Sequence, residues 1–294
     1  MPETTDSCRF TVDLEKCIGC GACARDCVAG IIVVRGGKPH VPPESAGDGI
    51  GCQHCLAVCP VGAASVLGLS PGDSIPLNKP GGPGRPGGPE EAGRPAFAPD
   101  ALALLVKARR SVRQFSPEPV PRDLLDRLLA EAAYAPTGVN SLSRRVAVIR
   151  DPAVMDAFRR RAAETLAVKK AEIPEQLSWL VDMAEGWLSG GPDELFRSAP
   201  HLLVLSAPKD APCPTQDCLI EMAYFDLLAQ ANGVGTVWAG IVHWLLQALP
   251  ELQRVLGIPD GHLCVYAMMF GLPKTRYART VQRAAENIAF IDAL

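Results

Sequence analysis

The chain has 294 residues, 48% of them hydrophobic, and this length predicts two compact domains with a sizeable core in the larger one. The 29 basic and 32 acidic residues leave a net charge of −3, which gives no electrostatic reason to expect nucleic acid or an anionic membrane as a partner. No apolar run approaches the roughly 20 residues of a membrane span, and the N-terminal residues lack a signal-peptide pattern. We therefore expect a cytoplasmic protein.

Cysteine is concentrated at the start of the chain, where eight of the 11 cysteines precede residue 60. One run has the spacing C-x2-C-x2-C-x3-C, and a later run has C-x2-C-x3-C followed by proline. Three thiolates spaced three residues apart on one winding loop converge on one point, as a cubane iron–sulfur cluster requires. A disulfide framework is disfavoured because we expect no export, and structural zinc usually takes two C-x2-C pairs from separate elements. The seven candidate ligands are Cys17, Cys20, Cys23, Cys27, Cys52, Cys55 and Cys59.

The region of residues 1–69 resembles the bacterial ferredoxins, over about residues 9–69. In two-cluster ferredoxins the fourth cysteine of each run ligates the cluster of the other run. The resemblance implies that one [4Fe-4S] cluster is held by Cys17, Cys20, Cys23 and Cys59. A second cluster would be held by Cys27, Cys52, Cys55 and the residue at position 49. That residue is Gly49, where the family has cysteine.

The second cluster site is therefore incomplete, and several outcomes are open. It could hold [4Fe-4S] with a substitute ligand, hold [3Fe-4S], or be empty. The substitute ligand could be Asp48, His54, Cys8 or water. We favour an occupied site, because an abandoned one would leave three close thiols with no reason to stay close.

Residues 70–99 form a segment of different composition, with Pro or Gly at 15 of the 29 positions from 71 to 99. Such a segment has few apolar side chains to bury, and we expect a surface tether. Gly82, Gly84 and Gly87 match the dinucleotide-binding pattern G-x-G-x-x-G, but the interleaved prolines exclude the strand and helix that this pattern requires.

Residues 100–294 read as a mixed domain of helices and strands. Apolar periodicity and capping signals predict helices at residues 121–134, 151–170 and 219–231. Short apolar runs predict strands at residues 145–150, 201–206, 235–241 and 262–270, with His201 at a strand start and His243 at a helix start. Helices that bracket a small sheet indicate an α+β or three-layer domain.

Four segments of this domain carry groups suited to a phosphate and a polar ring. Residues 109–115 hold Arg109, Arg110, Ser111 and Arg113, whose guanidinium groups match phosphate oxygens. Residues 135–141 form a turn rich in Pro, Gly and Asn directly after a predicted helix. Residues 233–240 lead into a predicted strand, and residues 271–274 precede the arginines at 276, 279 and 283.

In this order the segments resemble the nitroreductase family of FMN enzymes, whose R-R-S-x-R-x-F, A-P-[ST]-x-x-N, G-[LV]-G-[ST]-x-W and G-x-P-K motifs match within about residues 104–284. The resemblance implies an α+β fold with a three-layer α/β/α domain, and a homodimer with FMN at each of two subunit interfaces. It assigns the ribityl phosphate to Arg109, Ser111 and Arg113, joined by Arg283 from the C-terminal segment. It places Asn140 near the flavin ring and the backbone of Ala239 and Gly240 near the N5 edge, and Arg110 and Gly138 are further cofactor-binding candidates.

The sequence departs from the family after Asn140, where Ser141-Leu142-Ser143 replaces the usual continuation with Gln-Pro. The segment 173–195, with Trp179, Met183 and Trp187, falls where family members vary and often cover the substrate, and we assign it no role.

Together the two resemblances imply an oxidoreductase in which one-electron carriers feed a flavin. Electrons would come from a ferredoxin-like donor or NAD(P)H, and a hydride from N5 of reduced FMN would reduce a nitroaromatic, quinone or activated alkene. No catalytic side chain is expected. Two alternatives are a reductive dehalogenase-type flavoenzyme and a non-catalytic electron carrier or redox sensor.

Overall fold

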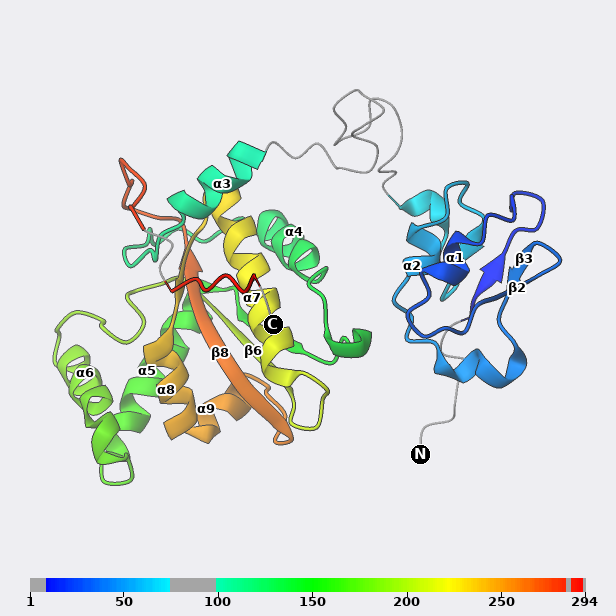
Figure 1. The fold of residues 1–294 in the computed structure, drawn as a ribbon. Coiled ribbons are helices and arrows are strands. Elements are labelled where there is room, and N and C mark those ends of the chain that lie inside the picture. The colour runs from blue at the N-terminus through cyan, green and yellow to red at the C-terminus, as the bar shows by residue number, and fades with distance from the viewer. Residues whose placement is uncertain (1–8, 75–98, 284–286, 293–294) are drawn as a thin grey trace. The chain divides into compact units, whose positions relative to one another are not determined.

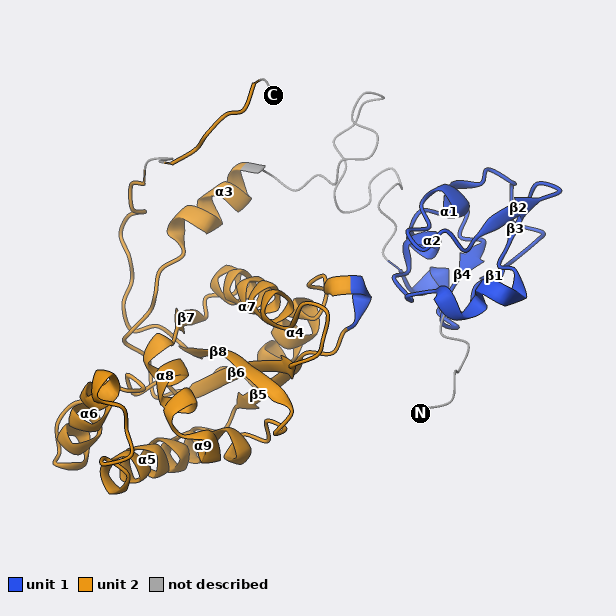
Figure 2. Cartoon of the chain, turned by 60° about the horizontal axis from the view of Figure 1, so that its bottom comes forward, with its two compact units in different colours: residues 1–97, 139–141 blue, residues 98–138, 142–294 orange. Residues whose placement is uncertain are grey.

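A computed structural model describes residues 9–74, 99–283 and 287–292 of the chain. The described residues fall into two units, one within residues 1–97 with 139–141 and the other within residues 98–138 with 142–294 (Figure 2). Cys8 and most of the expected tether, residues 75–98, lie outside the described residues.

The first unit is built from short elements around its cysteines. Strand β1 (Thr11–Val12) pairs antiparallel with β4 (Ala64–Ser65), and β2 (Val33–Arg35) pairs antiparallel with β3 (Lys38–His40). Two four-residue helices, α1 (Ala22–Arg25) and α2 (His54–Ala57), each follow a left-handed residue. Its small core contains the buried residues Cys23, Ile31, Ile32, Cys55, Leu56 and Val66.

The two cysteine runs of this unit form a structural repeat with an offset of 32 residues. Helix α2 begins 32 residues after α1, and the left-handed Gly51 (φ 61°) lies 32 residues after the left-handed Gly19 (φ 71°). A Cβ on Gly19 would lie 2.7 Å from the carbonyl oxygen of Gly37, so the close approach of that backbone requires glycine. Both cysteine runs are therefore wound in the same way.

The second unit contains a four-stranded antiparallel sheet in the order β5-β6-β8-β7. Its central strands β6 and β8 are labelled in Figure 1, and all four strands are labelled in Figure 2. The strands are β5 (Arg145–Ile149), β6 (His201–Pro208), β7 (Gly235–Trp238) and β8 (His262–Gly271), and β6 carries a register shift at Leu205/Ser206. The long central strands β6 and β8 are buried along almost their whole length.

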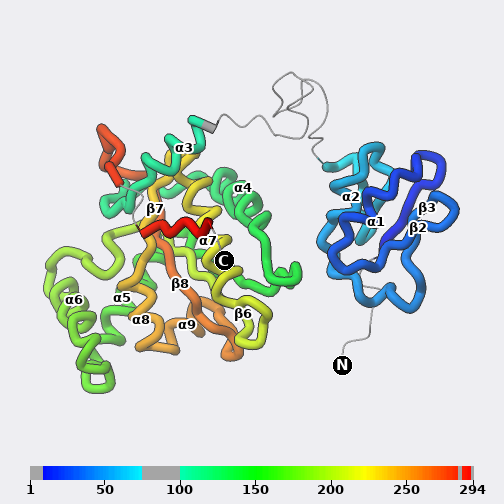
Figure 3. The backbone as a smooth tube through the Cα atoms, viewed as in Figure 1, coloured from blue at the N-terminus to red at the C-terminus, as the bar shows by residue number. Residues whose placement is uncertain are grey.

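Helices cover both faces of this sheet (Figure 3). One hydrophobic cluster joins the sheet to α4 (Arg122–Ala132) and α7 (Pro214–Ala231). The other joins it to α5 (Pro152–Val168), α6 (Ser178–Leu188), α8 (Gly240–Ala248) and α9 (Pro250–Val255). The helix α3 (Pro99–Ala108) precedes these layers in the chain. The expected α+β fold with three α/β/α layers is confirmed.

The predicted elements form within a few residues of their expected bounds, with one error. The strand expected over residues 235–241 ends at Trp238, because Gly240 begins α8. The side chains of Val242, Leu245 and Leu246 are buried at helical spacing, so this apolar run continues as a helix that packs on the sheet. His201 begins β6 as expected, whereas His243 lies in the first turn of α8 rather than at its start.

Candidate functional site

Four cysteines line one hollow in the first unit. Two of them come from the loop before α1, one from α1 itself, and one from the segment after α2. They are Cys17, Cys20, Cys23 and Cys59, the set expected for the first cluster. These residues are free thiols, and within the described residues no three His, Cys, Asp or Glu side chains converge on the position of a single metal ion. Four sulfur donors around one hollow are the ligand set of a multi-iron cluster.

Backbone N–H groups surround one of these sulfurs. The Ala63 N–H donates to Cys59 Sγ at 3.2 Å. Burial acts to raise the pKa of the Cys59 thiol, but the backbone N–H groups of residues 61–64 outweigh burial and hold that pKa below its ordinary value. Burial raises the pKa of the Cys23 thiol. The N–H groups at Cys59 favour the thiolate, which is the form that ligates iron.

A second hollow is lined by the remaining cysteines of the two runs, Cys27, Cys52 and Cys55. Gly49 also lines it, at the repeat position that Cys17 occupies in the first hollow. Its backbone is extended (φ −73°), so the backbone conformation at this position does not require glycine. Among the substitute ligands considered, His54 lines this hollow and Asp48 is not in its lining.

In the second unit, three of the four expected flavin motifs lie side by side. The Val112 N–H donates to Thr236 O at 2.8 Å, which sets the Arg109–Phe115 segment along the edge of β7. The Lys274 N–H donates to Gln114 O at 3.0 Å, which brings the segment after β8 to the same place. Segments more than 100 residues apart in the chain are thus joined at one edge of the sheet.

A buried carboxylate that sequence reasoning missed organises this edge. Asp226, on α7, is 4% exposed and accepts a hydrogen bond from Trp238 Nε1 at 2.9 Å and another from the Thr236 hydroxyl. Its Oδ2 lies 3.6 Å from Arg109 Nη1. Within the described residues that buried nitrogen makes no hydrogen bond, and Asp226 is its ion-pair partner. The only sequence signal was an acidic residue inside the apolar stripe of a helix.

The turn after α4 is also tied to α7. The Gly138 N–H donates to Asp217 Oδ1 at 2.9 Å, and a Cβ on Gly138 would lie 2.7 Å from Cys213 Sγ, so the turn is built around glycine. Asn140 lies in the same short turn with a left-handed φ of 55°. In residues 141–143, where the sequence differs from the family, the Leu142 N–H donates to the Thr137 hydroxyl at 3.1 Å.

The other assigned residues lie in different surroundings. Arg113 is exposed, with Nη1 3.4 Å from Ser111 O, and Arg283 is exposed in the segment after β8. Arg110 is half-buried. The Ala239 N–H pairs with Ala267 O at 2.9 Å, and a Cβ on Gly240 would lie 3.2 Å from the Tyr266 hydroxyl. The structure thus joins Arg109 and Ser111 to the end of β7, without bringing Arg283 into a described contact with them.

A histidine in the first turn of α8 packs against Tyr266. The ring of His243 stacks on Tyr266 with the centroids 4.9 Å apart, and burial lowers the pKa of this histidine. His243 is therefore an uncharged, packed side chain near neutral pH.

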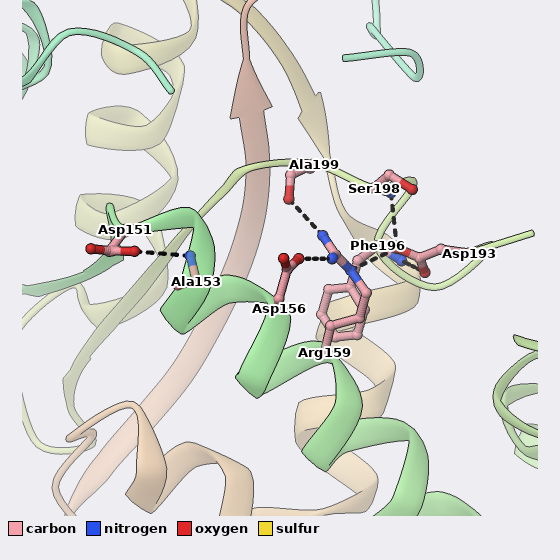
Figure 4. A network of polar contacts seen from close by, with 8 residues as sticks. All are labelled: Asp151, Ala153, Asp156, Arg159, Asp193, Phe196, Ser198 and Ala199. Carbon is pink, nitrogen blue, oxygen red and sulfur yellow. Dashed lines mark hydrogen bonds and ion pairs between the residues drawn. The ribbon is translucent and has the colours of Figure 1, made fainter. Parts of the chain in front are cut away.

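The segment after α6 is held by an ion-pair network on α5 (Figure 4). Arg159 places Nε 2.8 Å from Asp193 Oδ2 and donates from Nη2 to Ala199 O at 2.8 Å. The same carboxylate accepts the N–H groups of Phe196 and Ser198, both at 2.8 Å. This network fixes the chain between α6 and β6, at the end of the region 173–195.

The three-layer fold, the sheet edge that gathers the motifs, and the cysteine hollows together define a redox protein. The Nitroreductase family model matches residues 106–272, and the model of the 4Fe-4S dicluster domain matches residues 16–63. The chain therefore belongs to the nitroreductase family, and it carries a 4Fe-4S dicluster domain on its N-terminal side. It is an oxidoreductase.

Individual relatives agree with this membership. A Thermus thermophilus protein named NADH dehydrogenase is 29% identical over 181 residues, which cover 58% of this chain and 84% of that protein. A Thermotoga neapolitana iodotyrosine deiodinase is 26% identical over 134 residues, or 45% of this chain and 70% of that protein. The crystal structure of a Bacteroides fragilis nitroreductase with bound FMN superposes with a TM-score of 0.55 at 20% identity, covering 65% of this chain and 98% of that one. Within the described residues no helix has the length and apolar character needed to cross a membrane.

Proposed function

We propose that this protein is an iron–sulfur flavoprotein that passes electrons from a one-electron donor through the clusters of residues 1–69 to FMN in residues 100–294. The observation that carries this proposal is the hollow lined by four cysteines, in the same chain as a nitroreductase-family domain. A cysteine set of this kind serves one-electron transfer, and flavins take up electrons singly or in pairs.

FMN is the cofactor that fits the second unit. The Bacteroides fragilis structure holds FMN in the same fold, and the motif segment here carries the half-buried Arg109 and the exposed Arg113. We assign the phosphate to Arg109, Ser111 and Arg113, and the N5 edge to the backbone of residues 239–240. When bound, FMN would supply the two-electron reduction chemistry. Homodimerisation would complete the site, with Arg283 joining it there.

The overall reaction consumes two electrons and two protons for each acceptor molecule reduced. The electrons come from a ferredoxin-like donor or from NAD(P)H, the class of donor suggested by the name of the Thermus relative. The protons come from water. The acceptor is a small nitroaromatic, quinone or activated alkene. The location is the cytoplasm, because cysteines stay reduced in that compartment.

Reductive dehalogenation is the second candidate function, favoured by the Thermotoga relative named iodotyrosine deiodinase. In that reaction the same two electrons and one proton would replace a carbon–halogen bond with carbon–hydrogen and release halide. A non-catalytic electron carrier is the third candidate function. A pure carrier would not need a separate flavin domain of this size.

A reoxidation experiment separates these functions. The protein, purified anaerobically and reduced with dithionite, is mixed with nitroaromatic, quinone, alkene and haloaromatic compounds, and flavin absorbance is followed. Faster reoxidation by a member of the first three classes supports the proposal, and faster reoxidation by haloaromatics with halide release supports dehalogenation. No acceleration over buffer by any compound would contradict a reductase.

A further inference from the structure

The loop of residues 49–55, which lines the second cysteine hollow, differs from its repeat, residues 17–23, at three positions. Where the first half has Cys17, Gly21 and Ala22, the second half has Gly49, Gln53 and His54. The first of these changes removes a sulfur ligand. The last introduces an imidazole, a common metal ligand, on the wall of the same hollow.

The backbone of the second half nevertheless follows that of the first. Gln53 holds a left-handed φ of 64° where Gly21 has 67°, although that conformation is costly for a residue with a Cβ. As a result α2 begins at His54, as α1 begins at Ala22. The imidazole is thus placed at the first residue of the helix that follows the cysteine loop.

The orientation of the His54 ring is set by a carboxylate. His54 Nδ1 lies 3.2 Å from Asp26 Oδ2, and Asp26 directly precedes the cluster ligand candidate Cys27. Metal-binding histidines usually donate one ring N–H to a carboxylate, which fixes the tautomer and leaves the other nitrogen as the ligand. That contact engages Nδ1 and leaves His54 Nε2 as the nitrogen for a metal.

Placement also separates His54 from Asp48. The His54 side chain is 57% exposed, and His54 lines the hollow. Asp48 is exposed and does not line the hollow. We propose that His54 is the fourth protein ligand of a [4Fe-4S] cluster at the second site, replacing the cysteine that Gly49 lacks, with Asp26 holding its ring. This inference rests on the proposed occupation of the second site.

The test is a nitrogen-coupling measurement on the whole chain. The protein is produced with ¹⁵N-labelled histidine, reduced anaerobically and studied by pulsed EPR, and iron is counted on the same sample. We expect about eight irons per chain and a histidine ¹⁵N coupling several times larger than the couplings of backbone nitrogens. The His54→Ala variant, which carries the residue found at the equivalent position 22, should lose that coupling. It should retain about seven irons and show the EPR signal of an oxidised three-iron cluster.

Two further variants guard against a general effect on the first unit. His40→Ala changes a histidine of β3 and should leave both the coupling and the iron count unchanged. The double variant Gly49→Cys/His54→Ala restores a cysteine at an extended backbone position, and should regain about eight irons without the histidine coupling. Such a rescue shows that His54→Ala removes a ligand and does not unfold the unit.

Several results would overturn the inference. One is about eight irons in the unaltered protein without a large histidine coupling. Another is a coupling that survives His54→Ala. A third is about seven irons with a three-iron signal before any substitution. About four irons per chain would show the second site empty, and would overturn the occupation on which the inference rests together with the inference itself. The iron count thus separates the two failures.

Discussion

Trp238 donates its indole N–H to Asp226 Oδ2 at 2.9 Å, which ties the end of β7 to the buried face of α7. The same carboxylate oxygen lies 3.6 Å from Arg109 Nη1. One buried acid thus connects the arginine assigned to the FMN phosphate with the strand end that leads to the residues assigned to the N5 edge. Asp226 is a positioning residue in this arrangement.

Asp226→Asn is expected to weaken FMN binding. The amide can still accept from Trp238 but loses the charge that faces Arg109, at a cost of about 1–2 kcal/mol, or roughly a tenfold rise in the Kd for FMN. Titration of the apoprotein with FMN by fluorescence quenching measures this change. Asp182→Asn, at an exposed position of α6, is the matched control. An unchanged Kd for Asp226→Asn would refute the role of Asp226.

Gly138→Ala should destabilise the turn that follows α4. The new Cβ would lie 2.7 Å from Cys213 Sγ and 2.9 Å from Cys213 Cβ, and such overpacking costs about 1–3 kcal/mol. Urea unfolding measures the free energy of unfolding. In a Cys213→Gly background both contacting atoms are absent, so the same substitution should cost much less. Equal costs in the two backgrounds would show that the crowding has another source.

Asp193→Asn should lower the free energy of unfolding by about 3–5 kcal/mol, because it leaves the guanidinium of Arg159 buried without its partner. The Asp193 side chain is 3% exposed and that of Arg159 is 9% exposed. Asp156, the other acidic partner of Arg159, is 72% exposed, and Asp156→Asn should change stability by less than about 1 kcal/mol. Urea unfolding of both variants checks the difference, and similar losses would contradict it.

Stability should fall as the pH drops below the ordinary histidine pKa, because of His201. Burial lowers the pKa of His201, and its Nε2 accepts the Val120 N–H at 2.9 Å, which a protonated ring cannot do. Between the lowered folded pKa and the unfolded value near 6.5, the unfolded state binds more protons, so folding weakens toward acid.

Urea unfolding between about pH 5 and 7.5 measures this slope, which reaches at most about 1.4 kcal/mol per pH unit for one proton. His201→Gln keeps an acceptor for Val120 and should flatten the profile. The half-buried His243, whose pKa is lowered as well, should leave a smaller slope of the same sign. A profile that is identical in His201→Gln would contradict this assignment.

The sequence predicted local features better than buried polar ones. Cysteine spacing predicted that the three thiols of each run converge, because a loop of fixed spacing wraps one centre, and the ferredoxin resemblance predicted which distant cysteine joins each set. Apolar periodicity located α4, the Asp151-Pro152 capping signal located α5, and short apolar runs located the central strands. The end of β7 was missed because the run through Ile241 is apolar in either conformation, and only packing on the sheet selects the helix. Asp226 was missed because its partners, Arg109 and Trp238, come from distant parts of the chain.

The flow of electrons from the cysteine domain to the flavin is the central claim, and rapid mixing tests it most directly. The anaerobic protein is mixed with a reduced ferredoxin, and reduction of the bound FMN is followed by absorbance in the unaltered chain and in a Cys20→Ser/Cys23→Ser variant. FMN content and photoreduction of the variant show whether its flavin site is intact. We predict that the variant keeps its FMN and is reduced by the ferredoxin at least about tenfold more slowly, since a lost ligand pair removes the first cluster. Equal rates in the two proteins would contradict transfer through the cysteine domain.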